Sequence, residues 1–255
     1  MSVPAAQGPA TPDPYTGALF QPLYAPMSRG DWALELVPML VAPGYWSPAR
    51  LVQDVAVLKR RSSTGQWSTW MSMTPMEMES QEIGIRLAHG HVLIFGMGMG
   101  WSAAATAMLP AVTQVTVVER DADVIALHQA LGTLAQLPDQ AHAKLRVVQG
   151  DALRYVPEAA VDLLMPDIWL PLVGGDRVGE VARMQANVRA RSIYFWGQEM
   201  EIARHAVRDG RALDEAGIAR TVAGFGLPLL GPQTPDYAER TRHVADRWMR
   251  DRWLS

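Results

Sequence analysis

The chain has 255 residues, of which 49% are hydrophobic and 19% charged, and it carries a formal net charge of −3, six histidines and no cysteine. This composition excludes a disulfide framework and a thiolate metal site, and it shows neither the basic excess typical of nucleic-acid binding nor an apolar run near the roughly 20 residues of a membrane span. Because the beginning of the chain also lacks the pattern of a secretory signal, we expect a cytoplasmic protein with one sizeable core, no metal site, and no nucleic-acid or membrane partner.

Residues 1–26 contain several prolines and little apolar pattern, which predicts an extended N-terminal tail. The tail is either mobile or draped along the surface, in which case Tyr15, Leu19 and Phe20 are its anchors. Residues 27–82 are rich in apolar residues without a helical period, and the turn signal SSTG interrupts them. We therefore predict a small antiparallel β unit of two to four strands that packs directly on the rest of the chain.

From residue 83 to residue 255, short apolar strands alternate with helices. The strands are expected at residues 91–96, 115–119, 145–149, 161–165 and 192–197. The helices are expected at residues 101–109, 121–136, 177–190, 199–209 and, at the end of the chain, 236–255. This alternation predicts an α/β fold, namely a Rossmann-like, doubly wound and mostly parallel sheet preceded by the small antiparallel β unit. No final pair of strands is evident after residue 197, which predicts a truncated sheet.

Three glycines, Gly96, Gly98 and Gly100, stand at alternate positions between the first strand of this region and the helix that follows it. Glycine adopts backbone angles that other residues avoid, and it has no side chain to keep a ligand away from the main chain. A strand, a glycine turn and a helix in this order are typical of a nucleoside-binding site. A tight strand-to-helix turn without a ligand is the alternative interpretation.

Carboxylates stand at the ends of the next three strands, at Glu119, Asp151 and Asp167. Because the carboxyl ends of parallel strands meet at one edge of a sheet, we expect these side chains to lie beside the glycines. Glu119 can accept hydrogen bonds from both ribose hydroxyls, Asp151 from the exocyclic amine of adenine, and Asp167 can hold or deprotonate a substrate amine. Taken alone, each also has a structural interpretation: an exposed strand end, a helix cap and a turn, respectively.

The segments VLIFGMGMG, VTVVERDADVIAL, VVQGDAL and VDLLMPDIW resemble the motifs of the class I S-adenosylmethionine-dependent methyltransferase superfamily, and within it the spermidine-synthase-like branch. The resemblance implies S-adenosylmethionine as the cofactor and Asp167 as the catalytic residue. It also implies a cofactor site formed by Gly96, Gly98, Gly100, Glu119, Asp151 and Ala152. Trp101 follows the third glycine and is expected to cover the cofactor, with ordinary core packing as its alternative interpretation. The chain departs from the family pattern at Phe95 and Met99, where relatives carry an acid.

The acceptor site is expected to include Trp169, which follows Asp167, and Gln198, which follows the fifth strand. The segment WMSMTPMEMESQEIG places Glu79 and Gln81 just before the sheet, where the resemblance implies a substrate entrance. A polar helix start with methionines in the core is the alternative interpretation of this segment. The resemblance implies a small-molecule acceptor, and it leaves open whether the protein is a homodimer.

These features favour a methyltransferase, and three alternatives stay open. The first is an aminopropyltransferase similar to the polyamine synthases. The second is a non-catalytic relative that binds a nucleoside or a protein partner. The third is a nicotinamide-dinucleotide enzyme, for which Gly98, Gly100 and Ala103 have a loose G-x-G-x-x-A spacing.

Overall fold

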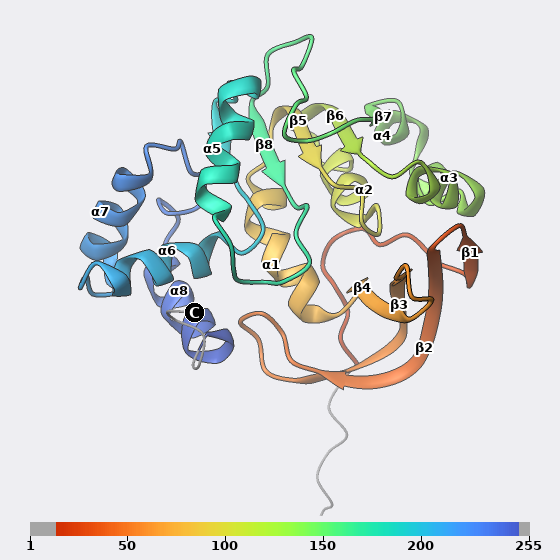
Figure 1. Cartoon of the computed structure of the whole chain (residues 1–255), viewed down its shortest axis with the longest axis horizontal. Helices are drawn as coiled ribbons and strands as arrows, with labels where there is room; N and C mark the ends of the chain where they lie inside the picture. The colour runs from red at the N-terminus through yellow and green to blue at the C-terminus, as the bar shows by residue number, and fades with distance from the viewer. Residues whose placement is uncertain (1–13, 250–255) are drawn as a thin grey trace, which may run out of the picture.

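Residues 14–249, which the computed structural model describes, begin with a four-stranded antiparallel sheet (Figure 1). Its strands follow one another in space as in sequence: β1 (Met27–Arg29), β2 (Trp32–Ala42), β3 (Arg50–Arg61) and β4 (Trp67–Ser72). The turn between β3 and β4 contains Gly65 at φ +84°, a left-handed conformation that glycine adopts without strain. The small antiparallel unit predicted from the sequence is therefore present, with four strands.

The second sheet is parallel and has five strands, β5 (Gly90–Phe95), β6 (Val112–Glu119), β7 (Leu145–Gln149), β8 (Leu163–Pro166) and β9 (Ser192–Ile193). Their spatial order is β7-β6-β5-β8-β9. The chain order reverses at β5, which lies between β6 and β8, so the carboxyl end of β5 is where a doubly wound sheet binds its ligands. Strands β5 and β8 are buried along nearly their whole length, as expected for covered parallel strands. The predicted Rossmann-like α/β architecture is confirmed.

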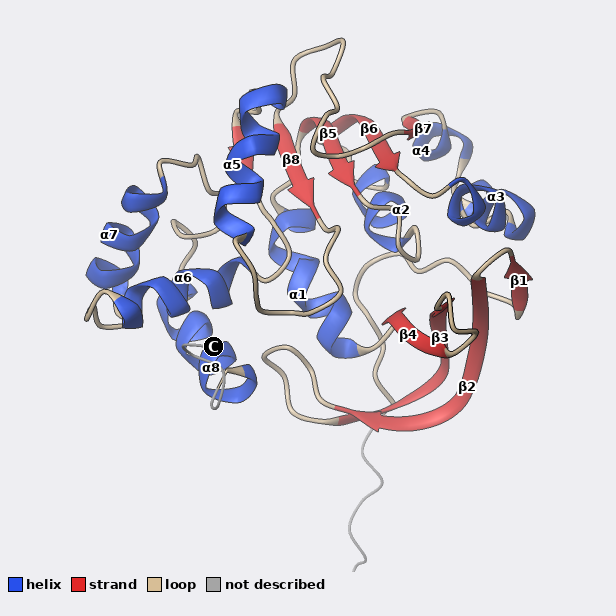
Figure 2. Ribbon diagram, in the orientation of Figure 1, coloured by secondary structure: helices blue, strands red, loops and turns tan. Residues whose placement is uncertain are grey.

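Helices connect and cover the strands (Figure 2). They are α1 (Pro75–Arg86), α2 (Trp101–Ala107), α3 (Ala122–Leu131), α4 (Asp139–His142), α5 (Arg177–Val188), α6 (Gln198–Arg208), α7 (Glu215–Phe225) and α8 (Tyr237–Trp248). Helix α3 ends before the predicted residue 136, because Gly132 adopts the left-handed conformation at φ +63° and a short 3₁₀ turn follows at Leu134–Gln136. The predicted boundary between two units at residue 82 falls inside α1.

Strand β9 is shorter than the strand predicted at residues 192–197. The main-chain amides of Tyr194 and Trp196 still donate hydrogen bonds to carbonyl groups of β8. Gly197, at φ +77°, then turns the chain into α6 and ends the pairing. Within the described residues after β9 the chain forms α6, α7 and α8 and no further pair of strands, which agrees with the predicted truncated sheet.

The terminal segments agree in part with the sequence-based expectations. Helix α8 covers part of the helix predicted at residues 236–255, of which residues 250–255 lie outside the described residues. Residues 1–13 of the predicted tail also lie outside them. The described part of the tail is draped on the hydrophobic core through the expected anchors Tyr15, Leu19 and Phe20.

One hydrophobic core unites the two sheets. Trp32, Leu34 and Leu58 of the antiparallel sheet belong to the same buried cluster as the inner residues of β5 and β6. In Figure 1 the antiparallel sheet lies across the ends toward which the arrows of β5, β6 and β8 point. The antiparallel sheet therefore faces the edge of the parallel sheet at which the sequence predicts a ligand site. None of the helices within residues 14–249 is both long and apolar enough to cross a membrane.

Gly84 offers a test of how α1 packs on the parallel sheet. A Cβ atom at Gly84 would overlap the ring of Tyr194, which is 1% exposed and donates a hydrogen bond to the carbonyl oxygen of Ser80. We therefore expect Gly84→Ala to lower the free energy of unfolding by about 1–3 kcal/mol, as overpacking does elsewhere. Gly224 in α7 has open space around its Cα, so the control Gly224→Ala should raise it by about 0.5–1 kcal/mol. Urea unfolding of both variants measures the two effects, and equal effects would contradict the close packing of α1.

Candidate functional site

A cleft lies between the carboxyl ends of the parallel strands and the inner face of the antiparallel sheet, with a cavity of about 160 Å³. The parallel sheet contributes residues that follow β5, β6, β7 and β8, and the antiparallel sheet contributes residues of β2, β3 and β4. A second cavity of about 10 Å³ adjoins it beside α1 and shares five lining residues with it. This inner cavity has room for about one water molecule and extends the cleft toward α1.

The glycine loop, residues 96–100, forms the floor of the cleft. Gly96 and Gly98 line both cavities and have φ angles of +93° and +49°. A Cβ atom on Gly96 would overlap the carbonyl oxygen of Asp167, and one on Gly98 would overlap the sulfur of Met71. Gly96 therefore requires glycine for both conformation and space, because the overlapping atom is main chain, whereas Gly98 favours glycine for its conformation and the flexible side chain of Met71 can move. Gly100 lines neither cavity and instead precedes α2 with a left-handed φ of +72°.

Three side chains from other parts of the chain hold the glycine loop in place. Glu119 Oε2 accepts a hydrogen bond from the main-chain amide of Met97 at 2.8 Å. His128 Nε2 lies 2.8 Å from the carbonyl oxygen of Gly98, and the hydroxyl of Tyr24 donates to the carbonyl oxygen of Met99 at 2.9 Å. The last two contacts were not predicted, because a histidine inside a helix and a tyrosine in a tail carry no local signal of such a role.

The environment of His128 determines its protonation state. Nε2 faces a carbonyl oxygen and must carry the proton, so Nδ1 accepts the hydrogen bond from the hydroxyl of Thr133 at 2.9 Å. The imidazole is 2% exposed, and burial lowers its pKa from 6.5 to about 4. His128 is therefore neutral at physiological pH and acts as a fixed anchor for the loop.

The predicted nucleoside-binding residues surround the opening of the cleft. Glu119 lines it, and its second oxygen accepts the main-chain amide of Asp121 at 2.8 Å. Because each carboxylate oxygen has two lone pairs, both oxygens can still accept one hydrogen bond from a ligand. The carboxylate of Asp151, 46% exposed, lines the cleft and accepts the amide of Leu153 at 3.0 Å, and buried Ala152 lies next to it.

Asp167 lies where the cleft and the inner cavity meet. Its Oδ2 accepts a hydrogen bond of 2.6 Å from Gln81 Nε2. The Oε1 atom of Gln81 in turn accepts a hydrogen bond of 2.7 Å from the hydroxyl of Ser102. Burial raises the pKa of Asp167 to about 6, against the opposing effects of the Gln81 hydrogen bond and of the Arg177 charge. Gln81 thus orients the carboxylate that the sequence analysis proposed for catalysis.

Glu77 is a second carboxylate at this junction that was not among the predicted site residues. It lines both cavities beside Asp167. Burial, together with the charge of Asp167, raises the pKa of Glu77 to about 8, so it is largely protonated near neutral pH. Its position on the first turn of α1, in a segment with several acids, did not by itself distinguish it from its neighbours.

The segment that follows β8 forms one wall of the cleft through Trp169. The guanidinium of Arg177, a residue that is 1% exposed, lies 4.6 Å from the ring centroid of Trp169. It also donates hydrogen bonds to the carbonyl oxygens of Pro171 and Leu172 in the same segment, and to that of Trp196 after β9. Arg177 thus joins this wall to the edge of the sheet.

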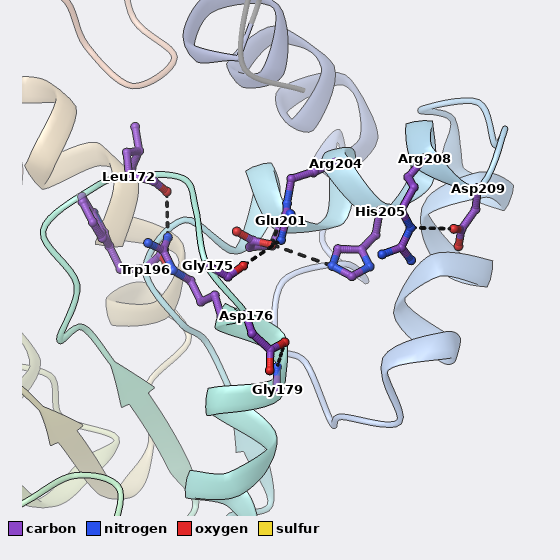
Figure 3. A network of polar contacts seen from close by, with 11 residues as sticks. Leu172, Gly175, Asp176, Gly179, Trp196, Glu201, Arg204, His205, Arg208 and Asp209 are labelled. Carbon is purple, nitrogen blue, oxygen red and sulfur yellow. Dashed lines mark hydrogen bonds and ion pairs between the residues drawn. The ribbon is translucent and has the colours of Figure 1, made fainter. Parts of the chain in front are cut away.

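A second arginine holds the end of the same segment, as Figure 3 shows. Arg204 on α6 pairs with fully buried Glu201 at 2.6 Å and donates to the carbonyl oxygen of Gly175 at 3.3 Å. The middle and the end of the connection between β8 and α5 are therefore held by Arg177, which also binds the residue before Gly197, and by Arg204 of α6. These contacts give Trp169 a defined position in the cleft.

Two of the predicted site residues, Glu79 and Gln198, bind other parts of the chain, and a third, Trp101, lies at the inner cavity. The carboxylate of Glu79 accepts hydrogen bonds from Trp46 and Ser47 in the loop between β2 and β3. The side-chain amide of Gln198 donates to the carbonyl oxygen of Leu230 and the hydroxyl of Tyr237, and neither Glu79 nor Gln198 lines a cavity. Trp101 lines the inner cavity with its indole N–H buried and without an acceptor among the described residues.

The structure therefore brings most of the predicted site together. The cleft and the inner cavity gather the predicted residues Gly96, Gly98, Trp101, Glu119, Asp151, Ala152, Asp167, Trp169 and Gln81. Gly100, Glu79 and Gln198 lie outside both cavities. Within residues 14–249 there is no group of three or more histidine or carboxylate side chains arranged to hold a metal ion.

Comparison with known proteins finds no matching family model and no matching curated protein. Solved structures similar to the chain include the glycopeptide N-methyltransferase MtfA complexed with S-adenosyl-L-homocysteine, at 22% identity and a TM-score of 0.34 over 43% of each chain. They also include the complex of DhpI with SAH, at 23% identity and a TM-score of 0.32 over 44% of this chain and 53% of that one. The methyltransferase domain of bacterial CtHen1-CN matches at 14% identity and a TM-score of 0.37 over 46% and 65%. The chain thus covers less than two thirds of the length of each of these structures. Similarity at this level does not establish a shared function.

The buried imidazole predicts how stability depends on pH. The pKa of His128 is about 4 in the folded protein and near 6.5 in the unfolded chain, so the unfolded chain binds the additional proton between these values. The contribution of the neutral imidazole to the free energy of unfolding is therefore fully present above pH 6.5, and it is lost as the pH falls toward 4. Between pH 7 and pH 5 we expect a loss of about 2 kcal/mol from this residue alone.

Urea unfolding of the wild type and of His128→Asn at both pH values measures this contribution. Between pH 7 and pH 5 the free energy of unfolding of His128→Asn should fall by about 2 kcal/mol less than that of the wild type. The control His243→Asn changes a histidine on α8 that none of these contacts involves, and it should keep the wild-type dependence. An identical pH dependence of His128→Asn and the wild type would contradict the neutral, buried imidazole.

Proposed function

We propose that the protein is an S-adenosylmethionine-dependent methyltransferase that acts on a small-molecule acceptor. The observation that carries the proposal is the arrangement of Glu119, Asp151 and Asp167, which end or follow three different strands and line one cleft above Gly96 and Gly98. In this arrangement the ribose binds to Glu119, the adenine lies beside Asp151 and Ala152, and the reactive group points toward Asp167.

The residues of the cleft fit such a ligand in three respects. Glu119 has a free lone pair on each oxygen for the two ribose hydroxyls. Gly96 and Gly98 leave the main chain open to the ligand. Trp101, which lines the inner cavity, has a buried N–H without an acceptor among the described residues, and this N–H suits one carboxylate oxygen of an amino-acid end. The carbonyl oxygen of the protonated Glu77 suits a hydrogen bond from the ammonium group.

Asp167 has the properties of a general base in this proposal. S-adenosylmethionine supplies an electrophilic methyl group on its sulfonium, so the protein has to align the acceptor and remove its proton. With a pKa of about 6, Asp167 is ionised at neutral pH and still basic enough to accept a proton. The hydrogen bond from Gln81 fixes the orientation of the carboxylate, and Trp169 forms the wall against which the acceptor packs.

One observation favours a second function, aminopropyl transfer from decarboxylated S-adenosylmethionine. The inner cavity is lined by Glu77 and Asp167 and by no lysine, arginine or histidine. Such a cavity suits an alkylammonium group without a carboxylate. A methyltransferase should therefore bind S-adenosylmethionine more tightly than its decarboxylated form. An aminopropyltransferase should show the opposite preference.

Binding of S-adenosylhomocysteine tests the proposal directly. We expect isothermal titration calorimetry to detect binding to the wild type. Glu119→Gln should weaken it by at least about 10-fold, because hydrogen bonds to a charged carboxylate are replaced by weaker ones. Glu158→Gln, whose side chain is 80% exposed and outside the cleft, should bind like the wild type. No detectable heat at high ligand concentration would refute the proposal, and tighter binding of the decarboxylated donor than of S-adenosylmethionine would support aminopropyl transfer instead.

Asp167→Asn separates catalysis from binding. We expect this variant to bind S-adenosylhomocysteine within about 3-fold of the wild type and to lower kcat by about 100-fold or more, since the amide cannot accept the proton. In the wild type, kcat/KM should rise with pH up to about 6 and then level off, because the carboxylate must be ionised to act as a base. Transfer of a labelled methyl group to a panel of small amines and alcohols measures both effects, with Glu158→Gln as the control. A variant with wild-type kcat would exclude Asp167 as the base.

A further inference from the structure

The wall of the cleft formed by the antiparallel sheet carries an arginine held between tryptophans. Arg60 on β3 pairs with Trp32 on β2, and the guanidinium carbon lies 5.3 Å from the ring centroids of both Trp32 and Trp70. The two rings meet edge to face, with centroids 5.4 Å apart. All three side chains line the cleft. The aromatic contacts therefore fix the position of the guanidinium at the surface of the cleft.

The donors of Arg60 are not used by the protein. Among the described residues its side chain makes no ion pair and no hydrogen bond within the limits of ordinary geometry. Contact with an aromatic face uses the plane of the guanidinium and leaves the N–H groups in that plane free for an oxyanion. Arg120, which follows β6 and also lines the cleft, likewise has no ion pair within the described residues.

Two carboxylates that line the same part of the cleft, Asp121 and Glu119, accept hydrogen bonds from donors other than these arginines. Asp121 accepts the indole N–H of Trp32 at 2.8 Å and the main-chain amide of Asp123 at 3.0 Å. Glu119 accepts two main-chain amides, as described above. The two arginines therefore lie near acids without pairing with them, and their charge is available to a ligand.

The outer part of the cleft carries both signs of charge, because Arg60 and Arg120 line it together with Glu119, Asp121 and Asp151. Asp167 and Glu77 lie at the inner end of the cleft, next to the proposed reaction centre, whereas Arg60 and Arg120 lie on the antiparallel sheet and beyond β6. We propose that the methyl acceptor carries an oxyanion, a carboxylate or a phosphate, that binds to Arg60 and Arg120, while its nucleophilic group faces Asp167. This inference rests on the proposed function, because it assigns the oxyanion to the acceptor and not to the donor. The tryptophans beside Arg60 favour an acceptor with a flat or apolar part next to its charge.

The test uses phenyl phosphate and benzoate as probes, titrated by calorimetry into the full chain saturated with S-adenosylhomocysteine. We expect at least one probe to bind in the millimolar range or better, and neutral benzyl alcohol to bind at least 10-fold more weakly. The probe that binds more tightly identifies the class of oxyanion. Arg60→Gln should weaken probe binding by at least 10-fold and Arg120→Gln by about 3-fold or more.

Two further variants separate charge recognition from damage to the fold. Arg60→Lys keeps the charge but loses the planar donors, so it should retain part of the binding that Arg60→Gln loses. Arg220→Gln changes an exposed arginine on α7, outside the cleft, and should bind the probes like the wild type. Circular dichroism and Tm of each variant show that the loss is not one of folding.

The results distinguish this inference from the proposed function. Unchanged probe binding by Arg60→Gln, or no binding of either probe to the wild type, would overturn the oxyanion site. Probe binding that S-adenosylhomocysteine abolishes would overturn its assignment to the acceptor. If S-adenosylhomocysteine does not bind but the probes bind through Arg60, the methyltransferase proposal and the assignment of the oxyanion to a methyl acceptor are both overturned. The cleft then still contains an oxyanion-binding site.

Discussion

The close approach of two backbone segments at the end of β5 is the constraint on which the rest of the site depends. The amide of Asp167 donates to the carbonyl oxygen of Phe95 at 2.8 Å, and the carbonyl oxygen of Asp167 lies where a side chain on Gly96 would have to be. Only glycine fits there, so the glycine loop and the carboxylate proposed for catalysis are held against each other by the main chain. A rigid backbone contact of this kind positions a reactive group more reliably than a flexible loop does.

The antiparallel sheet contributes both to stability and to the cleft. Trp32 packs in the common core and donates its indole N–H to Asp121, the residue that caps α3. Trp32 also lines the cleft, where its ring contacts the guanidinium of Arg60. The side chain of Trp32 thus connects the two sheets and positions the charge of Arg60. A substitution in this sheet can therefore change binding without touching the residues that follow the parallel strands.

The inner end of the cleft shows how burial sets the chemistry of neighbouring acids. Asp167 and Glu77 both have raised pKa values, but the hydrogen bond from Gln81 and the charge of Arg177 limit the increase for Asp167. At neutral pH one carboxyl group is therefore mainly ionised and the other mainly protonated. The ionised Asp167 can accept a proton, whereas the neutral Glu77 can donate a hydrogen bond. The different surroundings of the two carboxyl groups produce this difference.

The sequence by itself determined the order of the parallel strands and of most helices, though not of α4 and α7, and it determined the residues at the strand ends. The reason is that the period of apolar residues and the direction of parallel strands are local and topological properties. The sequence therefore placed Gly96, Glu119, Asp151 and Asp167 at one edge of the sheet. Only the tertiary structure decided which side chains from distant segments complete the cleft. Glu77 and Arg60 line it, and Tyr24 and His128 hold its glycine loop, whereas Glu79 and Gln198 line neither cavity. Contacts between distant segments depend on how the two sheets and α1 pack, which no local pattern encodes.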